Sequence, residues 1–171
     1  MQSNVWLRRI ILSGLFVALS VVLKQFALTT AEFRLSFYDL PLFIGGMVLG
    51  PMAGLAMGFA TDWVYVMINP FAFTFNFMTL SAMMWGLMGG VFFHPLKRLN
   101  VIILAFVIIG TSLIAFTLNS VQLYIMYGSG MLAQLPLRIV TMLIKWPIQI
   151  FAIHFIYHRV LVHTPYVLSK P

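Results

Sequence analysis

The sequence contains no cysteine and very little charge. Without cysteine, the chain has no disulfide framework, no thiolate metal site and no cysteine nucleophile. Only 3 residues are acidic against 10 Lys and Arg, and charged residues make up 8% of the 171 positions, whereas a soluble domain averages about 25%. Low charge, together with 62% hydrophobic residues and a mean hydropathy of +1.03, predicts a membrane protein.

Motifs for enzymatic chemistry are also missing. The sequence has no Gly-x-Ser-x-Gly motif, no phosphate-binding glycine loop and no paired-carboxylate motif. We therefore expect no enzymatic activity and no bound cofactor, and an ATP-driven process would need other subunits. His154 and His158 have the i, i+4 spacing of a metal pair, but no third ligand accompanies them, so we interpret them as interfacial histidines.

Apolar stretches separated by helix breakers predict six transmembrane helices. A span needs about 20 residues, and the chain has room for six spans with short loops and no soluble domain. The breaks fall at Gly-Pro, Asn-Pro and His-Pro pairs and at a Gly-Ser-Gly loop. The expected helices cover 7–26, 37–50, 53–68, 77–93, 101–127 and 137–161. The predicted fold is thus all-α: residues 1–171 form a single integral domain that crosses the cell membrane several times.

Basic residues at the segment ends predict the orientation. Because the number of spans is even, both termini lie on one side of the membrane. The basic residues on that side are Arg8, Arg9, Lys97, Arg98, Arg159 and Lys170. The other side carries Arg34, with Arg138 just inside the last helix. Cytosolic loops carry an excess of Lys and Arg, so both termini are expected in the cytosol. No basic face is presented outside lipid, so nucleic acid is not expected as a partner.

A second group of charged residues lies within or beside the apolar stretches. They are Lys24, Glu32, Arg34, Asp39, Asp62, Arg138 and Lys145. Charge is costly inside a bilayer, so these residues indicate a functional site. We expect some internal pairing, such as Asp39 with Arg34 or Asp62 with Lys145. Four basic groups against three acidic ones leave a surplus that suits an anionic ligand, because an arginine binds a carboxylate in bidentate fashion.

The predicted topology brings polar and aromatic residues to the outer half of the membrane. Arg138 and Lys145 share one face of the last helix, and Asn119 and Gln122 share one face of the fifth. The candidate substrate-binding residues are Arg34, Asp62, Trp63, Phe73, Phe75, Asn119, Gln122, Arg138 and Lys145. The aromatic residues fit an interfacial belt as well as a pocket. For Phe73 and Phe75, their place in a loop favours a pocket lid.

Small residues recur at a spacing that lets helix backbones approach closely. Those of the second to fourth expected helices are Gly45, Gly46, Gly50, Gly54, Gly58, Gly86, Gly89 and Gly90. We interpret them as internal packing. The first helix has Gly14-x-x-x-Ala18, and its outer face is easily spared from a six-helix bundle. An external partner for this face is therefore a second interpretation.

Several stretches of the sequence resemble the substrate-binding S components of energy-coupling factor (ECF) transporters. They are residues 33–41 (FRLSFYDLP), 45–51 (GGMVLGP), 54–62, 118–128 (LNSVQLYIMYG) and 135–138 (LPLR). The resemblance covers nearly the whole chain, and the folate group is the most similar. It implies high-affinity capture of a vitamin, expected to be folate, and docking on a membrane-embedded coupling subunit that carries two ATPase subunits. It also implies that Gly14 and Ala18 contact the coupling subunit.

Two alternatives remain open from the sequence. The loop 70–76 lacks the Pro-Gly pair expected before the fourth helix of a folate member, so pantothenate or another anionic vitamin is the alternative ligand. A membrane-embedded enzyme or a structural bundle protein is the alternative of another class. An enzyme would need a nucleophile and a base, which the sequence does not provide. A structural protein would not need Asp62, Arg138 and Lys145 inside lipid.

Overall fold

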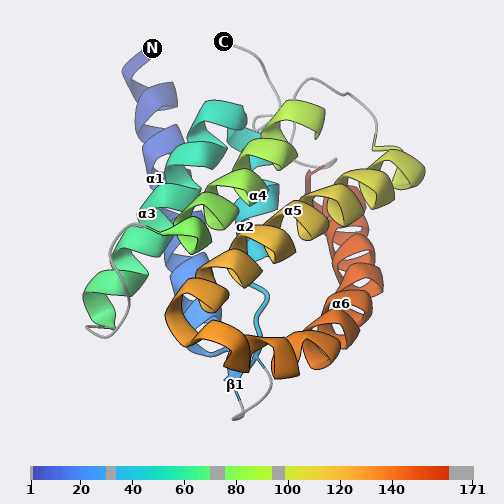
Figure 1. Ribbon diagram of the computed structural model, residues 1–171. Helices are drawn as coiled ribbons and strands as arrows, with labels where there is room; N and C mark the ends of the chain where they lie inside the picture. The colour runs from blue at the N-terminus through green and yellow to red at the C-terminus, as the bar shows by residue number, and fades with distance from the viewer. Residues whose placement is uncertain (1, 30–33, 70–75, 94–98, 162–171) are drawn as a thin grey trace.

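The computed structural model describes residues 2–29, 34–69, 76–93 and 99–161. These ranges contain six α-helices and one two-stranded hairpin (Figure 1). The helices are α1 (Gln2–Gln25), α2 (Asp39–Leu49), α3 (Pro51–Ile68), α4 (Phe77–Phe93), α5 (Val101–Tyr127) and α6 (Leu135–Ile156). A 3-10 segment, η1 (Gly128–Gln134), joins α5 to α6, and a π-helical turn, η2 (Tyr157–Leu161), follows α6. The helical architecture predicted from the sequence is confirmed.

The helix bounds follow the predicted breakers closely. α4 and α5 have the predicted bounds, while α1 begins at Gln2 and α6 at Leu135, both earlier than expected. The α6 start includes Pro136. Proline is tolerated in a first turn because a backbone N–H at that position would have no partner within the helix, so its absence costs nothing. One element was missed: β1 (Leu28–Thr29) pairs antiparallel with β2 (Arg34–Leu35). Two-residue strands are too short to show an alternating pattern.

Local signals explain how the helices begin and end. Gly50 has φ 98°, a conformation that favours glycine, and Pro51 starts α3 directly after it, so α2 and α3 form a tight antiparallel pair. Asn100 caps α5, and its side chain accepts a hydrogen bond from the Ile102 backbone N at 2.9 Å. Gly128 (φ 61°) ends α5.

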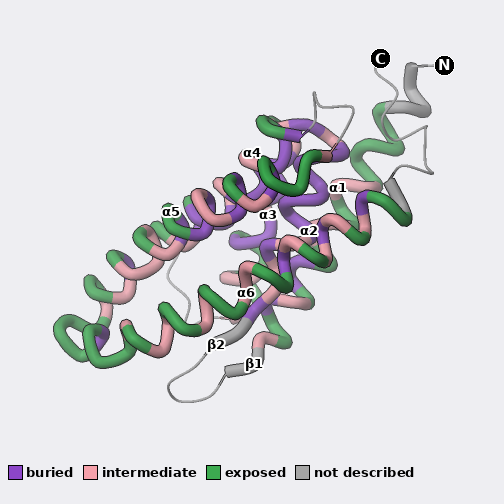
Figure 2. Tube along the Cα trace, turned by 90° about the vertical axis from the view of Figure 1, so that its right-hand side faces the viewer, coloured by how far each residue is buried: buried purple, intermediate pink, exposed green. Residues whose placement is uncertain are grey.

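The core lies where α4 packs along α2 and α3. The buried residues lie mainly on these three helices and on the side of α5 that packs against α4 (Figure 2), and residues 41–48 of α2 are all buried. A Cβ on Gly86 would lie 2.1 Å from the Gly54 carbonyl oxygen, and a Cβ on Gly46 would lie 2.0 Å from the Gly86 oxygen. Only glycine permits such close backbones, so the small residues of α2, α3 and α4 serve internal packing, as predicted.

The other helices are more peripheral. α1 packs against α2 and α3 through one face, whereas Gly14 and Ala18 lie on its exposed face. α6 packs against α5 and touches α2, and the far end of the α5–η1–α6 hairpin stands apart from α1–α4 (Figure 2). In Figure 1, α1 runs downward and α6 runs upward.

Several helices are compatible with a membrane. Within the described ranges, three stretches are long and apolar enough to cross a bilayer: Trp6–Gln25, Pro51–Ile68 and Val101–Arg159, the last of which contains both α5 and α6. α2 and α4 are shorter apolar helices. Many large apolar side chains are exposed on the surface of the protein, among them Trp6, Ile11 and Leu15. The protein is therefore built to be surrounded by lipid.

Candidate functional site

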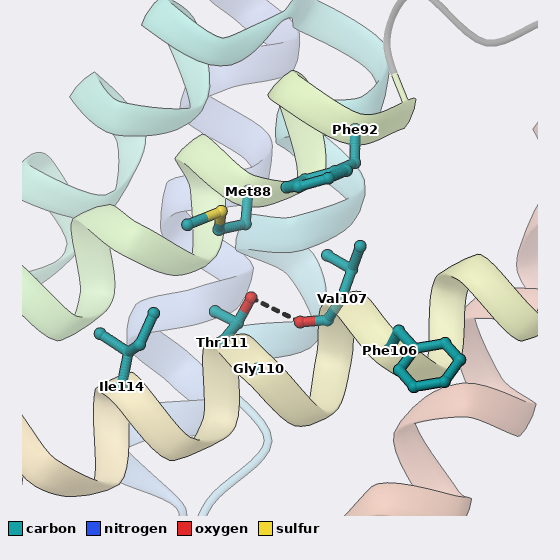
Figure 3. A pocket seen from close by; sticks show the side chains of 7 residues that line it. All are labelled: Met88, Phe92, Phe106, Val107, Gly110, Thr111 and Ile114. Carbon is teal, nitrogen blue, oxygen red and sulfur yellow. Dashed lines mark hydrogen bonds between the residues drawn. The ribbon is translucent and has the colours of Figure 1, made fainter.

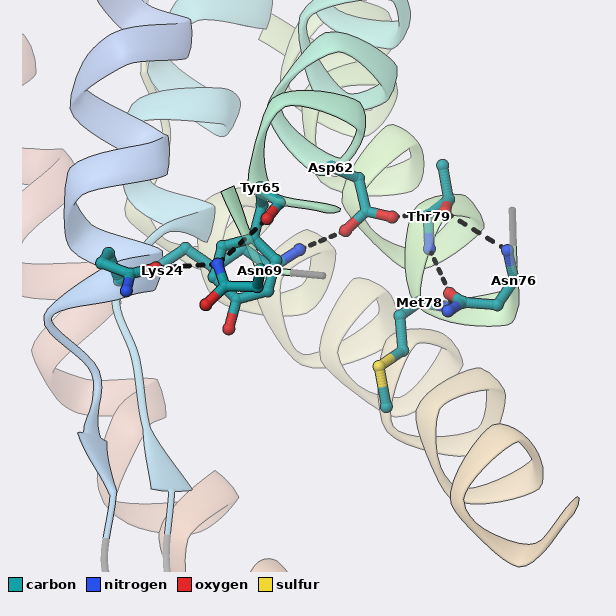
Figure 4. A network of polar contacts seen from close by, with 8 residues as sticks. Lys24, Asp62, Tyr65, Asn69, Asn76, Met78 and Thr79 are labelled. Atoms are coloured by element: carbon teal, nitrogen blue, oxygen red, sulfur yellow. Dashed lines mark hydrogen bonds and ion pairs between the residues drawn. The ribbon is translucent and has the colours of Figure 1, made fainter. Parts of the chain in front are cut away.

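An ion pair joins Lys24 of α1 to Asp62 of α3, and the hydroxyl of Thr79 on α4 donates to the second Asp62 oxygen (Figure 4). The side chains of the ion pair are 10% and 4% exposed, so both charges are taken out of water. The Lys24 ammonium also lies 5.2 Å from the centre of the Tyr38 ring and 4.5 Å from that of Tyr65. This network ties three helices together at one level.

The first turn of α4 is held by two side-chain amides next to this network. The Asn76 Oδ1 accepts hydrogen bonds from the backbone N of Met78 at 2.9 Å and of Thr79 at 3.2 Å. The Gln122 Oε1 of α5 accepts from the Phe77 backbone N at 3.3 Å. Helix starts leave backbone N–H groups without intrahelical partners, and these two amides satisfy them. Gln122, predicted as a ligand contact, caps the start of α4 in the structure.

A second buried cluster lies between α2 and α6. The Lys145 ammonium pairs with Asp39 Oδ2 at 2.7 Å, and the Gln149 amide donates to the same oxygen at 2.6 Å. Asp39 is 2% exposed and Gln149 is 1% exposed, whereas the Lys145 side chain is 20% exposed. Asp39 stands in the first turn of α2, where the helix dipole also stabilises a carboxylate.

The embedded charges pair internally, as predicted, but Asp62 and Lys145 do not pair with each other. Asp62 pairs with Lys24 rather than Lys145, and Lys145 pairs with Asp39. The Arg34 side chain lies outside the described part of the chain, so its suggested contact with Asp39 stays a prediction. The expected pairs were wrong for Asp62 because sequence alone does not show which helices are neighbours. α1 packs on α3, and α6 meets α2.

Arg138 of α6 lies against α5, on the side of that helix that also carries Asn119. The Arg138 guanidinium lies 5.2 Å from the centre of the Phe116 ring, and Asn119 follows Phe116 by three residues, so it faces the same side of α5. The Arg138 Nη1 and the Asn119 Oδ1 are both buried and make no hydrogen bond within the described residues. Buried polar groups of this kind normally have a partner. Two predicted site residues, Arg138 and Asn119, therefore each have a buried polar atom that is free to bind a ligand.

The predicted aromatic contacts differ in their placement. Trp63 is 43% exposed and stacks on Phe59, with the ring centres 5.8 Å apart, so it lies on the surface of α3. Phe73 and Phe75 lie outside the described residues. Of Arg34, only the backbone in β2 is described. That the loop with Phe73 and Phe75 covers the ligand therefore stays a prediction.

The two remaining sequence features are peripheral. No other part of the described structure lies within 4 Å of where a Gly14 Cβ would stand, so this position has room for an external contact, as does the exposed Ala18 one turn later. His154 and His158 lie close, with ring centres 4.4 Å apart. The described residues contain no group of three or more His, Asp or Glu that could hold a metal ion.

Sequence reasoning missed Gln149 as a member of the α6 polar face. A usable signal was present, because Gln149 follows Lys145 by four residues, so both polar side chains share one face of a mostly apolar helix. Lys24 and Asp39 were recognised as embedded charges but not assigned to the candidate site. Thr79 gave no signal, because isolated threonines are ordinary in apolar helices.

An apolar groove of about 250 Å³ lies between α4 and α5 (Figure 3). Its lining residues are Met88, Phe92, Phe106, Val107, Gly110, Thr111 and Ile114. The Thr111 hydroxyl donates to the Val107 carbonyl at 2.7 Å, so the groove offers no free side-chain donor to an anion. The polar groups of the candidate site lie outside this groove, in the networks around Asp62, Asp39 and Arg138.

Known proteins match both the sequence and the fold. A family model for the ECF transporter, substrate-specific component, matches residues 8–157. The folate transporter FolT of Clostridium novyi (strain NT) is 31% identical over 141 residues, which are 81% of this chain and 81% of that protein. The crystal structure of FolT bound with folic acid superimposes with a TM-score of 0.79 at 27% identity, covering 88% of this chain and 93% of that one. The chain thus belongs to the substrate-specific components of ECF transporters.

Proposed function

We propose that this chain is the folate-binding subunit of an ECF transporter that takes up the vitamin. Two similar proteins support folate: one is a folate transporter, and the other was crystallised with folic acid. Neither relative favours pantothenate, the alternative ligand. The family identity argues against a membrane-embedded enzyme or a purely structural bundle protein.

The observation that carries the proposal is the state of Arg138. The two ion pairs account for Lys24, Lys145 and both carboxylates. Arg138 instead has a buried guanidinium nitrogen without an acceptor in the part of the chain that the structure describes. Folate ends in a glutamate with two carboxylates, and a guanidinium binds a carboxylate through two parallel hydrogen bonds. A folate carboxylate at Arg138 would supply the missing partner.

Other residues complete the proposed binding site. Asn119 is well placed because it shares the Arg138 side of α5 and has a free acceptor. Arg34 would provide a second cation for the glutamate, and the aromatic residues would pack against the rings of the ligand. The proposed contacts, as a set, are Arg34, Asp62, Trp63, Phe73, Phe75, Asn119, Gln122, Arg138 and Lys145. Asp62 and Gln122 would act partly by ordering the helix ends through their networks.

The proposed topology is a single integral domain with six spans in the cell membrane and both termini in the cytosol. The six helices alternate in direction, and α1 and α6 run antiparallel (Figure 1). Arg8 and Arg9 stand near the start of α1 and Arg159 follows α6, so basic residues gather at the proposed cytosolic end. The helices α2 and α4 are short for a membrane span, and they would lie in the membrane packed against the longer helix α3.

The proposed partners are a membrane-embedded coupling subunit and two ATPase subunits, so ATP hydrolysis would take place outside this chain. The exposed face of α1 supports a protein contact, because Gly14 and Ala18 leave room for a close helix there. The apolar side chains beside them, including Ile11 and Leu15, are exposed as well. Docking at this face would leave the Arg138 region free for the vitamin.

The proposal is tested by identifying the ligand that purifies with the protein. Native mass spectrometry of the full chain in mild detergent should show a bound mass equal to that of folate or a reduced folate. A pantothenate mass in its place would keep the transporter role and overturn the folate assignment. Ligand-free protein that binds neither vitamin at micromolar concentration would overturn both.

A further inference from the structure

We infer that Asp39 is a positioning residue that holds Lys145 as a second ligand-binding cation. Gln149 in turn holds the Asp39 carboxylate in place. This inference rests on the proposed function, because it concerns how the same site grips its ligand. It adds Asp39 and Gln149 to the site. It also assigns Lys145 the role of a ligand contact two helical turns from Arg138 along α6.

Asp39 and Gln149 are buried, whereas the Lys145 ammonium that they support is more accessible. Asp39 Oδ2 accepts hydrogen bonds from Lys145 at 2.7 Å and from Gln149 at 2.6 Å. Asp39 and Gln149 are almost fully buried, while the Lys145 side chain is 20% exposed. An ammonium has three N–H donors, and within the described residues Lys145 uses one of them, on Asp39. The remaining donors are available to a ligand without breaking the ion pair.

Lys145 lies on the same face of α6 as Arg138. Seven residues separate them, which is two helical turns or roughly 10 Å along the axis. Folate has hydrogen-bond acceptors along its whole length, in its glutamate, its amide and its pterin ring. A molecule with one carboxylate at Arg138 and its long axis along α6 therefore meets Lys145 with a further acceptor. The two cations would fix both the end of the ligand and its direction.

The Asp39 cluster is poorly explained as a stabilising device. A buried ion pair often contributes less to stability than apolar side chains of the same size, because both ions lose their hydration. This cluster also leaves Asp39 Oδ1 and Gln149 Oε1 buried without a donor in the described structure. What the arrangement does achieve is to hold the Lys145 ammonium in a fixed position between α2 and α6.

A double-mutant cycle tests this inference with the full chain in detergent. The variants are Asp39→Asn, Lys145→Gln and the neutral double variant, and the measurements are folate affinity by calorimetry and the unfolding midpoint without ligand. Each single variant should bind folate at least tenfold more weakly than the wild type. In the Lys145→Gln background, Asp39→Asn should cost no further affinity, because there is no ammonium left to position. The double variant should regain most of the unfolding midpoint but not the affinity.

A matched control removes a charge that follows the C-terminal end of α6, away from the proposed site. Arg159→Gln, in the exposed turn after α6, should keep folate affinity within twofold. Wild-type affinity in the double variant would show a purely structural pair and overturn the inference. Unchanged or tighter binding by Asp39→Asn would also overturn it. A wild-type protein that binds no folate would instead overturn the proposed function, and with it the role assigned here to Lys145.

Discussion

The Lys24 ammonium of α1 and the Asp62 carboxylate of α3 form a buried ion pair, and Thr79 of α4 donates to the same carboxylate. One acidic residue therefore joins three helices. Two tyrosine rings lie beside the ammonium and shield it further. Such a pair stabilises the bundle only while both charges are present, because the removal of one leaves the other buried and unpaired.

This relationship predicts a large loss of stability in Lys24→Met. Breaking one side of a buried pair costs about 3–5 kcal/mol, so the unfolding midpoint in detergent should fall markedly. Arg8→Met removes an equal charge from an exposed position on the same helix and should leave the midpoint unchanged. Equal midpoints for the two variants would show that the ion pair does not hold α1 to α3.

The contact between α3 and α4 predicts that Gly86→Ala destabilises the protein. The new Cβ would lie 2.1 Å from the Gly54 carbonyl oxygen, and because that atom belongs to the backbone, the helices must move apart. Overpacking of this kind costs about 1–3 kcal/mol or more. Gly110→Ala is the matched control, since nothing lies within 4 Å of its Cβ, and alanine favours a helix. Thermal unfolding of both variants decides the matter, and equal midpoints would contradict the close approach.

The exposed face of α1 predicts a separation of transport from binding. Gly14→Trp and Ala18→Trp should abolish folate uptake by cells that contain all subunits, because a bulky side chain prevents a close helix contact. The purified variants should bind folate like the wild type, because both positions point away from the core. Thr117→Trp, on an exposed face of α5, is the control and should retain uptake. Parallel loss of uptake and binding would instead mean that this part of α1 packs internally.

The proposed topology predicts which cysteines an impermeant reagent can reach. The chain has no native cysteine, so single substitutions give an unambiguous signal. Ser129→Cys, in the exposed turn between α5 and α6, should be labelled in intact cells, and Gln2→Cys should be labelled only after lysis. The reverse pattern would invert the orientation.

The sequence predicted the helices well because their ends carry strong local signals. Gly-Pro, Asn-Pro and His-Pro pairs and a Gly-Ser-Gly stretch follow α2 to α5 in the sequence and mark where they stop, and the glycine spacing indicated close packing of α2, α3 and α4. These features depend on neighbours in the chain. The β1–β2 hairpin was missed because each strand has only two residues.

The candidate site was predicted less completely, because it depends on which helices are neighbours. Asp62 and Lys145 were recognised as embedded charges, yet their partners are Lys24 and Asp39. Trp63 follows Asp62 directly, but one residue turns a helix by about 100°, which places its ring on the exposed side of α3. A pairing across helices requires the tertiary packing, which no spacing in the sequence contains.

The most direct test of the account is the affinity of Arg138→Met for folate and pantothenate, measured by titration calorimetry beside the wild type and Arg159→Met. The wild type and the control should bind folate far more tightly than pantothenate. Arg138→Met should bind folate at least about tenfold more weakly, because a lost charge-assisted hydrogen bond costs about 1.5–3 kcal/mol and 1.4 kcal/mol is one decade. Unchanged folate binding by Arg138→Met, or a wild type that prefers pantothenate, would contradict the account.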